Sequence, residues 1–217
     1  MHAALRAADD LLRAAGRHRA GASTAPFATL AVALVACGLA YGGCMGSWGA
    51  RPLQSLFSGL KVPLLLAATT AICLPSFWMV NTLLGLRADT GAATRAVIGA
   101  QGVVAIALAA LAPMILFTYA SITEYTLAVL ANGAMFAVAS LGGQLSLARH
   151  YRALIARDPR HRIARDAWLA LYVFVAIQMA WVLRPFIGSP DIDVRFFRPD
   201  AWSNAYVVVA RLVALRF

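Results

Sequence analysis

Long apolar stretches separated by short clusters of charged residues are the main pattern of this sequence. Between successive clusters, the chain runs for 31, 25, 28, 24 and 17 residues without an Asp, Glu, Lys or Arg. A helix needs about 20 apolar residues to cross the roughly 30 Å hydrocarbon layer of a membrane. The stretches also lack the alternating pattern of a membrane-spanning strand. We therefore expect five transmembrane helices, near residues 27–46, 63–86, 96–119, 123–147 and 167–187.

The composition places the chain in the same class. Of its 217 residues, 61% are hydrophobic and 13% are charged, and the mean hydropathy is +0.73. A soluble domain is usually about half apolar and about a quarter charged, and a disordered chain has low hydrophobicity. The sequence therefore excludes both classes and predicts an all-α, polytopic membrane protein.

The basic residues predict how the chain sits in the membrane. If the N-terminus is cytoplasmic, 12 basic residues fall on the cytoplasmic side and 7 on the other. Lys and Arg are enriched in cytoplasmic loops, so we expect a multi-pass protein of the bacterial inner membrane with an extracytoplasmic C-terminus. This topology divides the chain into a cytoplasmic amphipathic segment (1–26), a transmembrane domain (27–187) and an extracytoplasmic cap with an interfacial C-terminal helix (188–217).

Three segments outside the expected spans have the pattern of helices that lie on a membrane surface. They are residues 1–18, 51–61 and 201–217. In residues 51–61, apolar positions recur at the i, i+3, i+4, i+7 spacing of one helix face. Such helices either cover the ends of the bundle or contact a partner subunit.

The fourth connection, residues 149–166, is rich in arginine. Basic residues beside a membrane attract anionic lipid head groups by about 1 kcal/mol each. No nucleic-acid recognition fold fits in so short a segment, so we expect lipids and not nucleic acid as its partners. Asp158-Pro159 is expected to break any helix here. The arginines are Arg149, Arg152, Arg157, Arg160, Arg162 and Arg165.

Glycine recurs at every fourth position near the end of the first apolar stretch. Gly38, Gly42 and Gly46 form two overlapping repeats of small residues, which give a helix a flat face that another backbone can approach closely. The partner is either a helix of the same chain or a helix of a second copy.

Several amide side chains lie inside the expected spans, where each needs a hydrogen-bond partner away from lipid. Five amides on four helices predict a polar seam in the interior of the bundle. The seam either fixes how the helices pack, at about 0.6–2 kcal/mol per hydrogen bond, or lines a water-filled path. Its members are Asn81, Gln101, Asn132, Gln144 and Gln178.

Two charges lie at the same expected depth near the outer rim. Glu124, the only glutamate of the chain, falls in the first turn of the fourth span, and Arg184 falls near the end of the fifth. Charged groups are costly in lipid, so we expect these two to form an ion pair. A proton-relay role for Glu124 is the alternative.

The residue patterns that support catalysis or cofactor binding are not evident in the sequence. The three cysteines have no metal-ligand spacing and the four histidines lie apart in polar flanks. Neither a phosphate-binding loop nor a nucleophile with its base is recognisable. We therefore expect no enzyme activity, no metal and no cofactor.

Three stretches of the sequence suggest a family. Residues 72–81 (ICLPSFWMVN), Ala112-Pro113 and residues 178–190 (QMAWVLRPFIGSP) resemble an uncharacterised family of bacterial multi-span membrane proteins. Some members of that family carry an automatic "actin-binding WH2" label. The chain is also distantly similar to the Yip1-type five-span membrane proteins. The resemblance implies architecture and, by analogy, membrane organisation or partner binding.

Two hypotheses of function follow from these patterns. The first is a non-catalytic integral membrane protein that binds partner subunits or copies of itself, in membrane organisation or as the scaffold of a complex. The second is an oligomeric channel or small-solute transporter whose path follows the buried amides.

Overall fold

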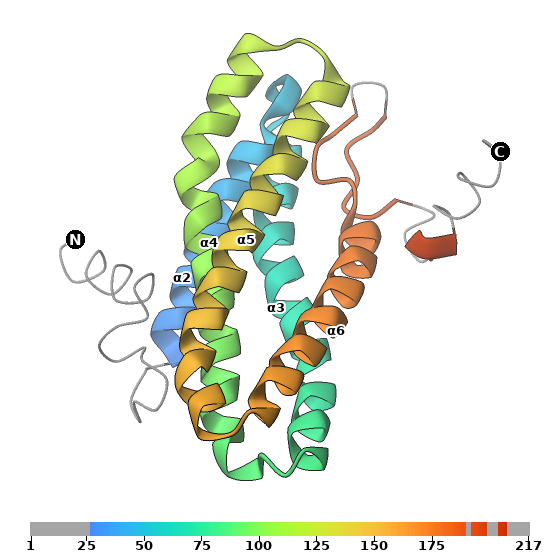
Figure 1. The fold of residues 1–217 in the computed structure, drawn as a ribbon. Coiled ribbons are helices and arrows are strands. Elements are labelled where there is room, and N and C mark those ends of the chain that lie inside the picture. The colour runs from blue at the N-terminus through green and yellow to red at the C-terminus, as the bar shows by residue number, and fades with distance from the viewer. Residues whose placement is uncertain (1–26, 190–191, 199–203, 208–217) are drawn as a thin grey trace, which may run out of the picture.

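The computed structural model describes residues 27–189, 192–198 and 204–207. Within them, five helices run side by side along one bundle (Figure 1). The predicted helix 1–18 lies outside the described residues, and so does 201–217 except for its residues 204–207. The helices are α2 (Phe27–Gly46), α3 (Pro52–Leu83), α4 (Thr90–Ser121), α5 (Tyr125–Arg157) and α6 (Arg160–Leu183), with the short 3-10 helices η2 (Trp48–Ala50) and η3 (Arg87–Asp89).

The lengths and apolar character of these helices are those of a helical membrane protein. Four of them, α3, α4 with η3, α5 and α6, are long and apolar enough to cross a membrane. The described apolar part of α2, Leu34–Gly46, is shorter than a full span. The prediction of an all-α membrane protein is therefore supported, while a membrane-spanning role for α2 stays a prediction.

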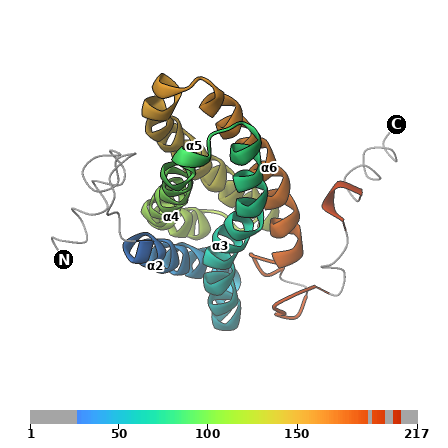
Figure 2. The same cartoon turned by 90° about the horizontal axis from the view of Figure 1, so that it is seen from below.

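The helices pack as an arc, in the spatial order α5, α4, α2, α3, α6 (Figure 2). Each helix packs closely on the next one in this order, but α5 and α6, at the two ends of the arc, contact each other little. A short turn joins them at one end of the bundle, and they diverge toward the other end (Figure 1). We call this other end, where α6 finishes, the capped end.

Two groups of buried side chains explain this shape. Toward the turn, Phe77 of α3 meets Trp168 of α6 edge to face, with ring centroids 5.2 Å apart, and both pack in one cluster with Val97 of α4 and Tyr151 of α5. The buried cluster nearer the capped end is built mainly by α2, α3 and α4. The arc is therefore closed near the turn and open between α5 and α6 at the capped end.

The predicted surface helix 51–61 is wrong as a separate element. Residues 52–61 are the first turns of α3, which continues without a break to Leu83. Leu53, Leu56 and Leu60 do face outward, at 47–59% exposed. The opposite face of these turns carries polar side chains that bind another part of the same chain, so the helix stands in the bundle and does not lie across its end.

The turn between α5 and α6 is shorter than the predicted connection 149–166. α5 continues to Arg157 and α6 begins at Arg160, which confirms that Asp158-Pro159 breaks the helix. The end of α6 also differs from the prediction, because the helix stops at Leu183 and residues 184–187 are not helical. Helices of 32 or 33 residues are about 48 Å long, so they extend beyond the apolar layer.

The glycine repeat of α2 faces α3 of the same chain. A Cβ atom on Gly42 would overlap the carbonyl oxygen of Ser58, and one on Gly46 would lie 2.6 Å from the carbonyl oxygen of Gln54. A Cβ on Gly38 would lie 3.0 Å from Pro63. Of the two partners left open by the sequence, the structure has the helix of the same chain.

Candidate ligand-binding site at the capped end

The chain that follows α6 folds over the capped end of the bundle. We call residues 184–189 and 192–198 the cap segment. Its beginning is held from α5 by the Tyr125 hydroxyl, which donates to the Ile187 carbonyl at 3.2 Å. Gly188 lies against the side chain of Gln54, where a Cβ would be 3.1 Å from Gln54 Cγ. The cap segment is therefore fixed to both α3 and α5.

Four side chains from the beginning of α3 bind the carbonyl groups of the cap segment. Gln54 Nε2 donates to Phe186 O at 2.9 Å and to Pro185 O at 3.3 Å, and the Ser58 hydroxyl also donates to Phe186 O. Arg51 Nη1 donates to the carbonyls of Ser189 and Ile192. Non-helical backbone carbonyls need such donors where water is excluded. We call these donors the cap anchor: Arg51, Gln54, Ser58 and Lys61.

Lys61 is the central member of the cap anchor and the only lysine of the sequence. Its side chain is fully buried. Its Nζ donates to Pro185 O at 2.7 Å and lies 4.9 Å from the ring centroid of Phe196. A buried ammonium is costly unless hydrogen-bonded, and these two contacts supply its partners. A carbonyl and an aromatic face thus hold the charge, without a carboxylate contact among the described residues.

The cap anchor was missed by the sequence analysis, although its signal is present. Gln54, Ser58 and Lys61 follow one another at i, i+4 and i+7, which is one face of a helix. The apolar face of the same turns predicts a surface helix, and Lys61 marks the boundary of a charge-free interval. A polar stripe opposite an apolar one indicates a partner on each side, here the cap segment and the lipid.

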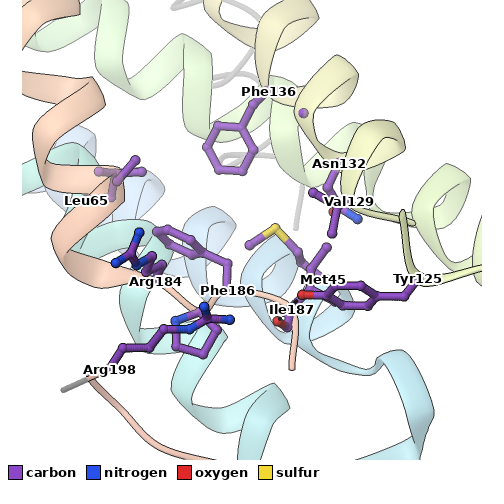
Figure 3. A pocket seen from close by; sticks show the side chains of 13 residues that line it. Met45, Leu65, Tyr125, Val129, Asn132, Phe136, Arg184, Phe186, Ile187 and Arg198 are labelled. Carbon is purple, nitrogen blue, oxygen red and sulfur yellow. Dashed lines mark hydrogen bonds between the residues drawn. The ribbon is translucent and has the colours of Figure 1, made fainter. Parts of the chain in front are cut away.

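A pocket of about 320 Å³ opens between α5, α6 and the cap segment. One wall comes from α5, where Val129, Gly133 and Phe136 share a face. Figure 3 shows Val129 and Phe136 across the pocket from Arg184 and Arg198, which lie together beside Phe186. Val129 is 42% exposed, and a Cβ on Gly133 would meet no atom within 4 Å. The pocket therefore reaches the outside of the bundle between the diverging helices.

The charged side chains that line this pocket are positive in the described part of the chain. They are Arg184 and Arg198. Arg184 is placed by Trp181, whose ring centroid lies 3.3 Å from the guanidinium carbon. Arg198 Nε is buried without a hydrogen-bond partner among the described residues. Apolar walls with cationic groups at one end suit a molecule that is apolar along its length and negative at its head.

A second, more polar pocket adjoins the first. It measures about 390 Å³ and shares Pro185 and Arg198 with the first pocket. Gln54, Arg195 and Asp193 also line it. Arg198 therefore stands between an apolar space that extends into the bundle and a polar space under the cap segment.

The five predicted amides do not form one seam. No hydrogen bond between two of them is present in the described part of the chain. Gln101 accepts from Tyr172 Oη at 2.7 Å, and Gln178 Oε1 accepts from the Ala205 amide at 3.0 Å. Asn81 donates to its own helix at Phe77 O, and Gln144 is half-buried. Asn81, Gln101 and Gln178 thus bind their own helix or different neighbours, which favours a structural role over a continuous polar path.

Asn132 is the best connected of these amides. It accepts from Tyr41 Oη of α2 at 3.2 Å and donates to Tyr119 Oη of α4 at 2.7 Å. Tyr119 in turn donates to Met45 O at 2.8 Å. This network joins three helices beside the pocket.

Replacing Asn132 with leucine is expected to destabilise the bundle by about 1–3 kcal/mol, because the buried Tyr41 hydroxyl loses its acceptor and the half-buried Tyr119 hydroxyl loses a donor. The thermal unfolding midpoint of the purified protein in a mild detergent measures the effect. Gln144→Leu is the matched control on the same helix and should leave the midpoint within a degree or two of wild type. Equal losses in both variants would show that amides of α5 matter only as polar groups and not through this network.

The predicted ion pair between Glu124 and Arg184 is not formed in the described structure. Glu124 is the N-cap residue of α5 and is exposed. Arg184 instead stacks on Trp181 and borders the pocket. Both residues lie at the capped end, as predicted, but their side chains form no ion pair with each other.

The six arginines predicted to meet lipid head groups gather at the end opposite the cap. Arg149, Arg152 and Arg162 are exposed, while Arg165 binds the carboxylate of Asp166 at 2.7 Å. Two others also have protein partners. Arg157 lies 3.6 Å from Asp89, and Arg160 Nη1 donates to Leu84 O at 3.4 Å. Their contact with lipid stays a prediction.

A further contact at this end escaped the sequence analysis. His161, which is fully buried, lies 3.2 Å from the carboxylate of Asp89 through its Nε2 atom. The two residues are 72 positions apart, so no local pattern joins them. No group of three or more His, Cys, Asp or Glu side chains suited to a metal ion occurs among the residues that the structure describes.

No protein-family profile matches this chain, and no curated protein or solved structure is significantly similar to it. The resemblance to bacterial multi-span proteins and to the Yip1-type proteins therefore stays a prediction.

Proposed function

We propose that this chain is a non-catalytic integral membrane protein that acts by binding a partner subunit or another copy of itself. The open side of the helix arc carries the proposal. Among the described helices, α6 packs closely on α3 alone, and residues Ala205 and Tyr206 also lie against it. In its most apolar window 11% of the residues are buried, against 50% for α3. Membrane helices gain stability by packing on neighbours, so a helix with one close helical neighbour offers a face for another.

The bacterial inner membrane and a cytoplasmic N-terminus are part of this proposal, on the strength of the basic-residue bias. A channel or transporter is the second candidate. It is less well supported, because the amides that were expected to line its path bind separate local partners. Asn132 borders the pocket at the capped end, but its hydrogen bonds go to Tyr41, Tyr119 and its own helix and not to another of the amides.

Flux and mass measurements separate the two functions. We expect liposomes that contain the pure protein to show no ion or solute flux above empty liposomes. We also expect native mass spectrometry in mild detergent to show a species heavier than the 23.0 kDa chain. Robust flux that is lost in Gln101→Leu would instead support the transport function and contradict the proposal.

The α6 face can be tested within the same assay. Ile177 of α6 is 47% exposed and Leu83 of α3 is 78% exposed. Ile177→Trp adds bulk to the proposed interface and should shift the mass distribution from the assembly toward the single chain. Leu83→Trp, the matched control on another helix, should leave the assembly unchanged. An assembly that is insensitive to both variants would place the interface elsewhere.

A further inference from the structure

The pocket between α5, α6 and the cap segment combines two features that a membrane ligand would use. Its walls are apolar where the two helices diverge, and its cationic residues lie where α6 ends. Its volume of about 320 Å³ falls within the roughly 300–1,000 Å³ that is usual for small-molecule sites. The pocket therefore has the size and the polarity of a binding site.

The side entrance indicates that the ligand comes from the membrane. α5 and α6 contact each other little, and Val129 and Gly133 are exposed along the α5 wall. Gly133 has no side chain to fill the gap, and a Cβ atom at its position would meet no other atom within 4 Å. A flexible hydrocarbon chain can lie in this gap with one side still facing the lipid.

The cationic end indicates the charge of the head group. Among the described residues, the charged side chains that line the pocket are Arg184 and Arg198. Lys61, which donates to the carbonyl of the lining residue Pro185, adds a positive charge beside it. A guanidinium binds phosphate and carboxylate oxygens through two parallel hydrogen bonds. An anionic group at Arg198 would be attracted by these charges and would supply a hydrogen-bond partner for the buried Arg198 Nε.

We infer that this pocket binds one anionic amphiphile, an acidic membrane lipid, with its head group at Arg184 and Arg198 and an acyl chain between α5 and α6. The adjoining polar pocket shares Arg198 and gives the head group room beyond the phosphate. The inference rests on the proposed binding function, and it names an acidic lipid as a second ligand beside the protein partner. The cap anchor gives the site its rigidity, because it fixes Pro185 and Phe186 beside the arginines.

Native mass spectrometry of the full chain in mild detergent tests the inference with defined lipids. Phosphatidylglycerol is expected to bind one molecule per chain at least tenfold more tightly than phosphatidylcholine. Arg198→Gln should weaken phosphatidylglycerol binding about tenfold. Arg152→Gln removes an exposed arginine at the opposite end and should change it less than twofold. Equal binding of both lipids, or equal effects of both substitutions, would overturn the inference.

The tail site has its own pair of variants. Gly133→Leu fills the gap along the α5 wall and should weaken phosphatidylglycerol binding about tenfold, with the charges untouched. Gly142→Leu on the same helix also enters open space and should leave binding unchanged. This pair keeps the test valid if an arginine variant fails to fold, because neither added side chain meets a neighbouring atom at its Cβ.

Inorganic phosphate distinguishes a lipid from a soluble anion. Millimolar phosphate that binds the wild type and is lost in Arg198→Gln, while Gly133→Leu leaves phosphatidylglycerol binding unchanged, would show a soluble-anion site and overturn the inference. Failure of the lipid inference can be told apart from failure of the proposed function. If lipid binding fails, the protein can still assemble and show no flux. If liposomes show flux, the scaffold function is contradicted, and the lipid-binding result still stands as measured.

Discussion

Replacing Gly42 with alanine is expected to destabilise the helix bundle by about 3 kcal/mol, although it adds a single methyl group. The new Cβ would overlap the carbonyl oxygen of Ser58 and lie 2.8 Å from the Cα atom of Gly59. Both are backbone atoms of α3, so no side chain can rotate away and the two helices must separate. Overpacking of this kind typically costs about 1–3 kcal/mol, and contact with backbone places Gly42 at the upper end.

Gly43 supplies a control one position away. A Cβ there would meet no atom within 4 Å, and alanine is favoured over glycine in a helix by up to about 1 kcal/mol. Gly43→Ala should therefore equal or exceed the wild type in thermal unfolding midpoint in mild detergent, while Gly42→Ala falls by many degrees. A wild-type midpoint for Gly42→Ala would show that α2 and α3 are not held at this distance.

The spacing of charged residues explains which features of the fold the sequence could predict. Charge-free intervals located all five helices, because charged side chains are excluded from hydrocarbon with few exceptions. Lys61 is the exception, and it moved the expected start of the second helix from Pro52 to residue 63. An interval method assumes that every charge marks a membrane surface. A lysine that is buried beneath the cap segment breaks that assumption.

Tertiary partners account for the other differences. Residue type and depth correctly located Arg184 and Glu124 at one end of the bundle, but the pairing of Arg184 depends on where the chain turns after Leu183. The five amides could be recognised as polar groups inside spans, whereas their partners come from separate helices. Gln101 binds Tyr172, 71 positions away. Pairings of this kind are set by how the helices pack, which no local spacing specifies.

The candidate pocket shows the same limit. Its walls come from α5 and α6, which are adjacent in sequence and joined by a tight turn, so their divergence was not expected. Trp168 and Tyr151 belong to one buried cluster that joins α5 and α6 near the turn. At the capped end no such cluster joins the two helices among the described residues, and Gly133 and Ala180 line the pocket between them. The divergence therefore depends on contacts between side chains far apart in the sequence, which no local pattern specifies.

Lys61→Met is expected to release the cap segment, and with it the arginine side of the pocket. Methionine has nearly the length of lysine but no donor, so Pro185 O loses its 2.7 Å hydrogen bond and keeps only the 3.3 Å contact with Gln54. A hydrogen bond from a charged group contributes about 1.5–3 kcal/mol. That free energy corresponds to roughly a ten- to hundredfold increase in the population of the opened cap.

Trypsin reports this opening at a single bond of the cap segment, because proline follows both Arg184 and Arg198 and leaves Arg195-Phe196 as the cleavable site. The fragment that ends at Arg195, identified by mass, should form roughly ten- to hundredfold faster from Lys61→Met than from wild type. Leu60→Met, an adjacent substitution at a 47% exposed position, should leave that rate unchanged. Equal rates for Lys61→Met and Leu60→Met would show that the lysine does not hold the cap segment, which would then depend on its other hydrogen-bond donors, Arg51, Gln54, Ser58 and Tyr125.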